Sequence, residues 1–316
     1  MQQRKPMLAR MGMVVALATL SCALWGSAFA FVKMGYELFG VASNSPAQQM
    51  LFAGMRFCLA GVFVLAGTAV VRRRLPVPTR NDLAPIALLA LSQTTLQYVP
   101  FYIGLAHASG TNSALVQGTS AFVQIVLATL VFAQEKLTLR KLVGCTLGLG
   151  GVAMVTLRGG GMVGSWSYMG EGLVFASVVA GGCAACLMRR YGSGGDPLLL
   201  TGWQFLLGGS VMVLLGIALG GRITMCSPQA LGVLAYLGFL SASAFSMWSL
   251  LLKYNPVSRV AMFRFFIPMF GVLFSVVALG EMIPVAQLPA LVVALGLIVV
   301  GTVLVNTDVP REGVSD

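Results

Sequence analysis

Long apolar runs, each about 20 residues and unbroken by charge, divide this chain of 316 residues. A helix of that length spans the hydrocarbon core of a bilayer. Charged residues make up 9% of the chain, against roughly 25% in soluble domains, so they are too few to cover a water-exposed surface. Unbroken runs also favour helices over the shorter, alternating strands of a barrel. The sequence therefore predicts an all-α protein whose main surroundings are a lipid bilayer.

Capping residues followed by proline mark several of the boundaries between runs. Proline suits the first turn of a helix because it lacks the amide that would be unsatisfied there. The four pairs are Ser45-Pro46, Asp196-Pro197, Ser227-Pro228 and Asn255-Pro256. The first run is too long for the apolar region of a signal peptide, so we expect it to be retained as a helix. The predicted spans are 11–34, 46–70, 84–107, 112–134, 139–157, 168–190, 197–219, 229–252, 257–280 and 285–305.

Basic residues indicate how these ten spans are oriented. With the N-terminus in the cytoplasm, three basic residues fall outside (Lys33, Arg158 and Arg222), and Arg56 and Arg264 fall within spans. The cytoplasmic side then receives Arg4, Lys5, Arg10, Arg72, Arg73, Arg74, Arg80, Lys136, Arg140, Lys141, Arg189, Arg190, Lys253, Arg259 and Arg311. This bias predicts ten transmembrane helices with both termini cytoplasmic. It also explains the net charge of +11 without a nucleic-acid partner. We expect the membrane to be a bacterial inner membrane.

The two halves of the chain repeat one another at an offset of 146 residues. Val126, Leu127, Val131 and Glu135 fall on Val272, Leu273, Val277 and Glu281. A unit of five helices crosses the membrane an odd number of times, so the second copy must be inverted, as in many secondary transporters. The predicted units are 1–157 and 168–305, joined by a linker at 158–167 and followed by a cytoplasmic tail at 306–316.

The fourth span carries a polar stripe. Ser113, Gln117, Ser120 and Gln124 follow one another at steps of four, three and four, which places them on one helical face. Such a face is costly in lipid, so it either lines a cavity or bonds to neighbouring helices. Both interpretations stay open from the sequence.

Aromatic residues accompany polar ones in other spans. Gln97, Tyr98 and Tyr102 lie in the third span around Pro100, which frees a backbone carbonyl and permits a kink. Trp25 and Trp248 lie inside the first and eighth spans, away from the interfacial belt where tryptophan is common. A mixed aromatic and polar pocket is one interpretation, and core packing is the alternative.

The charges within the spans indicate what such a pocket would bind. No Asp or Glu lies in the middle of any span, whereas Arg264 does. An arginine there needs a cavity, a carbonyl or an anion, so we predict a substrate with a carboxylate or other anionic group; a structural charge is the alternative. The predicted substrate-binding residues are Trp25, Gln97, Tyr98, Tyr102, Gln117, Ser120, Gln124, Trp248 and Arg264.

Other chemistries find little support. The chain has one histidine, His107, and no mid-span acid, which argues against an intramembrane enzyme and gives proton coupling less support than facilitated diffusion or exchange. Cys183-Ala-Ala-Cys186 has no His or carboxylate nearby and is expected to pack, so no metal or cofactor is predicted. Small residues in the fifth and tenth spans, such as Gly144 and Gly301, predict scaffold or oligomer helices in a monomer or homodimer.

Several short motifs resemble the EamA branch of the drug/metabolite transporter superfamily. They are Trp25-Gly26-Ser27, Phe31-Val32-Lys33, Arg56-Phe57, Ala106-His107-Ala108-Ser109 and the glutamates that close spans four and nine. The resemblance covers about residues 11–305 and implies ten helices, inverted five-helix repeats and metabolite transport, often export, through a cavity formed by spans 1, 3, 4, 6, 8 and 9. Characterised members include aromatic amino-acid exporters. This chain departs from the family pattern at Phe122, where many members have proline, and at Arg264, where relatives are often apolar or aromatic.

These observations predict an exporter of small metabolites that works by alternating access. Amino acids or related carboxylate-bearing compounds are the first candidates for the substrate. An exchanger of organic anions or phosphorylated metabolites is the alternative within transport, and a non-transporting membrane scaffold is the alternative outside it.

Overall fold

The computed structural model describes residues 6–42, 44–108, 110–157, 167–224, 226–279 and 288–307. The structure is 87% helical, and no strand occurs within these ranges. Eight helical segments of the described residues are long and apolar enough to cross a membrane. Glu281, most of the predicted linker and the tail from residue 308 lie outside the described residues.

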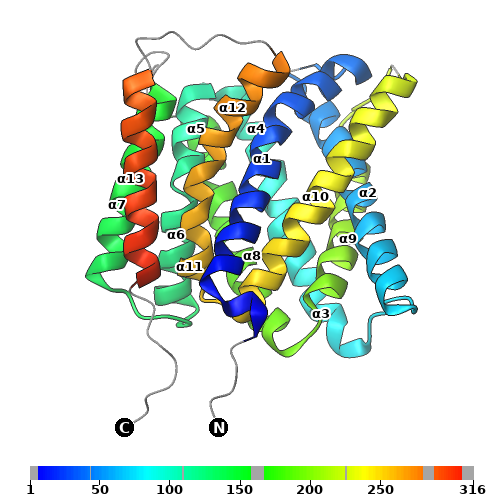
Figure 1. The fold of residues 1–316 in the computed structure, drawn as a ribbon. Helices are drawn as coiled ribbons and strands as arrows, with labels where there is room; N and C mark the ends of the chain where they lie inside the picture. The colour runs from blue at the N-terminus through cyan, green and yellow to red at the C-terminus, as the bar shows by residue number, and fades with distance from the viewer. Residues whose placement is uncertain are drawn as a thin grey trace.

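The helices begin and end within a few residues of the predicted spans (Figure 1). The first half contains η1 (Met7–Ala9), α1 (Met11–Phe39), α2 (Pro46–Arg72), α3 (Arg80–Leu89), the π-helix η2 (Ala90–Thr95), α4 (Leu96–His107), α5 (Gly110–Gly118), α6 (Ser120–Val126), the π-helix η3 (Leu127–Val131) and α7 (Leu139–Thr156). The second half contains η5 (Tyr168–Gly172), α8 (Leu173–Gly194), α9 (Pro197–Ala218), α10 (Pro228–Tyr254), α11 (Val257–Ala261), the 3-10 helix η6 (Met262–Phe266), α12 (Ile267–Leu279) and α13 (Leu288–Thr307).

Two predicted spans, 84–107 and 139–157, are helical but are not among the eight segments. In the first of them the polar residues around Gln93 and Gln97 lower the mean hydropathy. The count of ten crossings therefore remains a prediction.

Three of the four predicted proline-linked caps are confirmed. The side chains of Ser45, Asp196 and Ser227 each accept a hydrogen bond from a backbone amide in the first turn of the following helix. The fourth prediction, Asn255, is wrong. The Nδ2 atom of Asn255 donates to the carbonyl oxygens of Leu8 and Leu251, at 3.0 Å each, so this side chain ties the N-terminal segment to α10 instead of capping α11.

The fourth span is not the continuous helix that the sequence predicted. α5 ends at Gly118, and Thr119 interrupts the segment without a proline. The Thr119 hydroxyl donates to the Val116 carbonyl at 2.7 Å, and the Thr119 amide donates to the same carbonyl at 3.0 Å. A threonine that bonds to its own turn competes with the regular helical hydrogen bonds, which accounts for the break.

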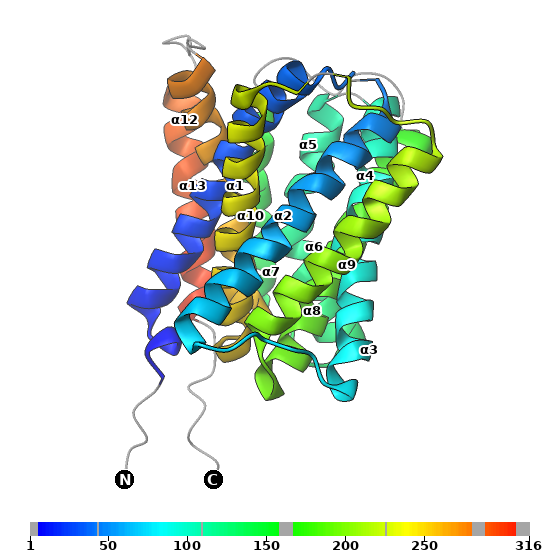
Figure 2. The same ribbon diagram turned by 90° about the vertical axis from the view of Figure 1, so that its right-hand side faces the viewer.

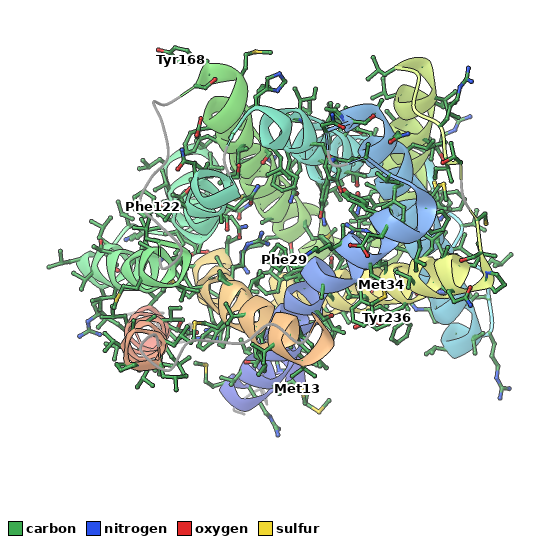
Figure 3. All side chains as sticks on the ribbon, turned by 90° about the horizontal axis from the view of Figure 1, so that it is seen from above. Met13, Phe29, Met34, Phe122, Tyr168 and Tyr236 are labelled. Atoms are coloured by element: carbon green, nitrogen blue, oxygen red, sulfur yellow. The ribbon has the colours of Figure 1, made fainter. Side chains whose placement is uncertain are left out.

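Helix packing follows a pattern that is repeated between the halves. α2 lies along α9 (Figure 2), and α7 lies along α13 at one edge of the bundle (Figures 1 and 3). α1 packs against α10 and α12, whereas its counterpart α8 packs against α4 and α6. Exchanging the two halves therefore reproduces the main contacts. Close packing of α7 on α13 relies on small residues, because a Cβ on Gly144 would lie 2.7 Å from the Gly301 carbonyl oxygen.

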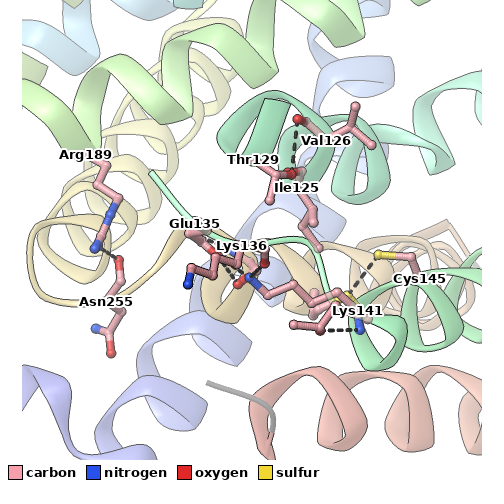
Figure 4. Close-up of polar contacts among 12 residues, drawn as sticks. Ile125, Val126, Thr129, Glu135, Lys136, Lys141, Cys145, Arg189 and Asn255 are labelled. Carbon is pink, nitrogen blue, oxygen red and sulfur yellow. Dashed lines mark hydrogen bonds and ion pairs between the residues drawn. The ribbon is translucent and has the colours of Figure 1, made fainter. Parts of the chain in front are cut away.

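Two pairs of helices, α1 with α8 and α2 with α9, run in opposite directions (Figures 1 and 2). We call the end of the bundle where α1 begins the near end, and the opposite end the far end. α8 ends at the near end, where Arg189 donates to the Leu252 carbonyl at 3.4 Å and to the Asn255 carbonyl (Figure 4). α2 also ends there, and its Arg72 pairs with Asp196 at the start of α9. α1 thus runs away from the near end while α8 runs toward it, and α2 and α9 are related in the same way.

Candidate functional site

A narrow cavity lies in the half of the bundle next to the near end, between η2, α4, α6, α8, α10 and η6. The space open to the centres of water-sized molecules is about 30 Å³, which suits a couple of waters and not a metabolite. Binding of a larger ligand therefore requires the surrounding helices to move apart. The lining residues are Gln93, Gln97, Gln124, Gly181, Ala185, Met188, Phe245, Trp248, Ser249, Leu252 and Arg264.

Pro268 determines the backbone conformation at Arg264. In a regular helix the Arg264 carbonyl would accept from the amide of residue 268, but proline has no amide hydrogen. The carbonyl accepts from Ile267 instead, which tightens residues Met262–Phe266 into a 3-10 turn. The irregular turn places Arg264 at the cavity, in the middle of the ninth span.

Aromatic faces and one hydroxyl hold the Arg264 side chain. Its guanidinium carbon lies 5.5 Å from the Trp25 ring and 5.9 Å from the Trp248 ring, within the range of cation–π attraction. Its Nε donates to the Ser120 hydroxyl at 3.3 Å. The lining residues include no Asp or Glu, so the positive charge faces the cavity without a counter-ion.

Aromatic rings form one wall of the cavity. Trp25 meets Trp248 edge to face with ring centroids 4.9 Å apart, and it meets Phe245 in the same manner at 5.0 Å. Trp25 lies behind this wall on α1, whereas Phe245 and Trp248 belong to α10, so these ring contacts join the two halves.

Three amide side chains also line the cavity. Gln93 and Gln97 lie one turn apart on η2 and α4, and Gln124 projects from α6. The Gln124 Oε1 atom is buried and has no hydrogen-bond partner among the residues that the structure describes, which leaves an acceptor for a ligand donor. A Cβ at position 181 would lie 3.0 Å from Gln97 Oε1, so the glycine at this position provides the space that the Gln97 amide occupies.

Four of the nine predicted site residues line the cavity: Gln97, Gln124, Trp248 and Arg264. Trp25 and Ser120 lie one contact away, against Trp248 and Arg264. The remaining three lie elsewhere. Tyr98 packs on Phe57 and Tyr102, and Gln117 donates to the Ser177 hydroxyl at 3.1 Å, which is the interhelical bonding considered as the alternative for the polar stripe.

Sequence reasoning missed the apolar part of the lining. Its periodicity contained the signal, because Phe245, Trp248, Ser249 and Leu252 follow the i, i+3, i+4, i+7 pattern of one helical face. On α8, Gly181, Ala185 and Met188 are spaced as i, i+4, i+7. Polar residues alone do not reveal the apolar faces that complete a cavity.

A buried ion pair, Glu135 with Lys141, lies at the near end of the bundle (Figure 4). Lys141 Nζ donates to Glu135 Oε2 at 2.8 Å, with both side chains about 5% exposed, and the Ser258 amide donates to Glu135 Oε1 at 3.0 Å. Burial alone would raise the pKa of Glu135, but hydrogen bonds from Lys141 and Ser258 outweigh it and hold the pKa below its usual value. Glu135 belongs to the first half and Ser258 to the second, so this contact links the halves.

Other chemistry is absent from the described part of the chain. All six cysteines are free, and the described residues contain no group of three or more His, Cys, Asp or Glu placed to hold a metal ion. The residues that line the cavity include no His, Asp or Glu that could serve as a base beside Ser249.

Comparison with known proteins gives a consistent result. The model of the EamA-like transporter family matches residues 12–157 and 168–307, once for each half. The chain is 26% identical to an S-adenosylmethionine/S-adenosylhomocysteine transporter of Chlamydia muridarum, over 95% of this chain and 94% of that protein. It is 27% identical to a probable terminal-alkyne amino-acid exporter of Streptantibioticus cattleyicolor, over 91% of each. It is 25% identical to an uncharacterized transporter of Archaeoglobus fulgidus, over 84% and 89% respectively.

A solved crystal structure has the same fold. It superposes with a TM-score of 0.78 at 18% sequence identity and covers 94% of this chain and 98% of its own.

Proposed function

The chain belongs to the EamA-like transporter family and is a multi-pass membrane protein, and on this premise we propose that it exports small carboxylate-bearing metabolites. Amino acids and their derivatives are the first candidates. Transport proceeds by alternating access, with the two halves rocking around the cavity.

Arg264 carries the proposal. A guanidinium faces the cavity without a carboxylate among the lining residues, so an anionic group of the substrate supplies the missing counter-charge. Arginine binds a carboxylate with two parallel hydrogen bonds, and the Nε contact to Ser120 leaves both Nη nitrogens for that purpose. The amides of Gln97 and Gln124 would bond to other polar groups, and the rings of Trp25 and Trp248 would pack the remainder of the substrate.

Two relatives support this substrate class. One is named for transport of S-adenosylmethionine and S-adenosylhomocysteine and the other for export of a terminal-alkyne amino acid. All of these compounds carry an α-amino-acid group, which presents a carboxylate of the kind that Arg264 would bind.

The arrangement of the halves supports alternating access. Helices α1 and α8 run in opposite directions, as do α2 and α9, which is the pattern of inverted repeats, and polar contacts join the halves at both ends. Glu135 accepts from Ser258 at the near end, and Asn112 donates to Glu171 at 2.7 Å at the far end. In the proposed cycle these contacts break in turn, which opens the narrow cavity to one side at a time. Basic residues gather at the near end, which we therefore assign to the cytoplasm.

The test is efflux from proteoliposomes. Purified protein is reconstituted into vesicles, which are loaded with a panel of labelled L-amino acids. Release of label from these vesicles is then compared with release from protein-free vesicles. We expect saturable efflux of at least one acid. Efflux that requires unlabelled acid on the opposite side would indicate an exchanger, and the absence of flux for every acid in the panel would contradict the proposal.

A further inference from the structure

A second arginine lies deep in the bundle, and the cavity does not account for it. Arg56 is the eleventh residue of α2 and only 7% exposed. Its Nε atom is buried without a hydrogen-bond partner, and no ion pair involves Arg56 in the described part of the chain. Its guanidinium carbon lies 4.5 Å from the Phe57 ring and 5.9 Å from the Tyr98 ring.

Arg56 and Arg264 share the same kind of environment. A buried guanidinium without an acid is costly in a membrane protein, and aromatic faces offset only part of that cost. Tyr98 adds a phenol group to the surroundings of Arg56, and its ring packs against Tyr102 with the ring centroids 6.2 Å apart. Both arginines therefore keep unused capacity to bind an anion.

Aromatic rings connect the two arginines without interruption. Arg264 lies over Trp25, which contacts Phe245 at 5.0 Å. Phe245 contacts Phe205 at 5.0 Å, and Phe205 stacks on Phe57 at 5.2 Å, next to Arg56. Trp25 also packs against two hydrophobic clusters, one that contains Phe57, Phe205 and Phe245 and one that contains Trp248. Because α2 begins at the far end, Arg56 lies on the far side of the cavity from the near-end contact between Glu135 and Ser258.

We propose that Arg56 is a second binding station for the substrate carboxylate, occupied as the substrate moves from Arg264 toward the far end. The inference rests on the proposed function. A carboxylate that leaves Arg264 would otherwise cross an apolar, aromatic region without any counter-charge, which would raise the barrier to transport. Arg56 supplies that charge when the far half opens and the rings around it separate.

The test separates binding in the cavity from passage through the far half. Equilibrium binding of the labelled L-amino-acid panel to solubilised protein reports on the cavity, and efflux from proteoliposomes reports on passage. For Arg56→Gln we expect efflux to fall by about tenfold or more, the factor typical of a lost charge-assisted hydrogen bond. We expect the dissociation constant to change by less than about twofold, since Arg264 is intact. Arg56→Lys keeps the cation and should restore most of the flux.

Controls make each outcome decisive. Arg222→Gln removes an exposed cation and should leave both measurements unchanged. Wild-type efflux in a folded Arg56→Gln variant, or equal losses in the Gln and Lys variants, would overturn the second station. If Arg56→Gln does not fold, Arg56→Met carries the test, because it removes the charge and leaves no buried polar atom unpaired. The same fall in efflux is expected, and wild-type efflux in a folded Arg56→Met variant would overturn the second station.

The outcomes also separate this inference from the proposed function. If Arg264→Gln abolishes binding while Arg56→Gln has no effect, only the second station fails. If the wild-type protein binds and transports none of the acids, both proposals fail.

Discussion

Arg264 donates a 3.3 Å hydrogen bond from Nε to the hydroxyl of Ser120, across the boundary between the two halves of the chain. Ser120 begins α6, directly after the break at Thr119, and Arg264 lies in the 3-10 turn that precedes Pro268. Ser120 thus follows a break in the helix of the first half, and Arg264 lies within an irregular turn of the second half. The hydrogen bond therefore connects the two irregular segments of backbone beside the cavity that Arg264 lines.

Replacing Pro268 with alanine should weaken substrate binding without destabilising the protein. An amide at position 268 could donate to the Arg264 carbonyl, so the 3-10 turn would relax toward a regular helix and rotate the guanidinium away from the cavity. Binding should weaken by at least about tenfold, because small displacements of a positioning group are costly. Equilibrium binding and thermal unfolding in detergent measure the two effects. Unchanged affinity in Pro268→Ala would show that the proline does not position Arg264.

Replacing Glu135 with glutamine should destabilise the protein. The change leaves the buried Lys141 ammonium without its counter-charge, which costs about 3 kcal/mol in comparable pairs. Asp196→Asn provides the comparison, because the Arg72–Asp196 pair is partly exposed and such pairs contribute about 1 kcal/mol or less. In thermal unfolding, the melting temperature of Glu135→Gln should be well below that of Asp196→Asn. Equal melting temperatures for the two variants would contradict the importance of the buried pair.

The same glutamate should make stability depend on acid pH. The pKa of Glu135 in the folded protein lies below its usual value of 4.5, so the unfolded chain binds the proton more readily. The stabilisation is therefore fully present above about pH 5 and is lost as pH falls below the unfolded pKa and through the lower folded pKa. Melting temperatures between pH 7 and pH 3 should decline less steeply in Glu135→Gln than in the wild type. Parallel profiles would contradict this assignment.

Replacing Gly144 with leucine should disrupt the pairing of α7 and α13. Even a Cβ at this position would lie 2.7 Å from the Gly301 carbonyl oxygen, so the two backbones would have to separate. Gly150→Ala on the same helix is the matched control, because nothing lies within 4 Å of the added atom. We expect a large fall in melting temperature for the first variant, and no fall for the second because alanine favours a helix by up to about 1 kcal/mol. Similar behaviour of both variants would refute the close-packing account.

Helix positions were largely predictable from the sequence, because apolar length and capping residues determine them locally. Asn255 was the exception among the caps, since its partner Leu8 is distant in the sequence. The break at Thr119 and the π-helix at Ala90–Thr95 were not predicted. Both depend on which backbone carbonyl accepts a hydrogen bond from a given hydroxyl or amide, and a hydrophobicity pattern carries no information on that.

The site was predictable only in part. Periodicity predicted Gln124 and Gln117 on one face of the fourth span, but it could not show that Gln124 lines the cavity while Gln117 bonds to Ser177. Polar side chains on a membrane helix can be hydrated in a cavity or hydrogen-bonded to a neighbouring helix. Only the tertiary contacts show which of these applies to each residue. Arg264 was easier to identify, because an arginine in mid-membrane is costly unless polar or anionic groups surround it.

Binding of an acid and its amide to two forms of the protein tests the central claim most directly. L-amino acids that bind the wild type are compared with their amides, in the wild type and in Arg264→Gln, as a double-mutant cycle. If Arg264 binds the carboxylate, the acid should bind about tenfold or more tightly than the amide in the wild type, and this preference should disappear in the variant. The same preference for the acid in a folded Arg264→Gln protein would contradict the account.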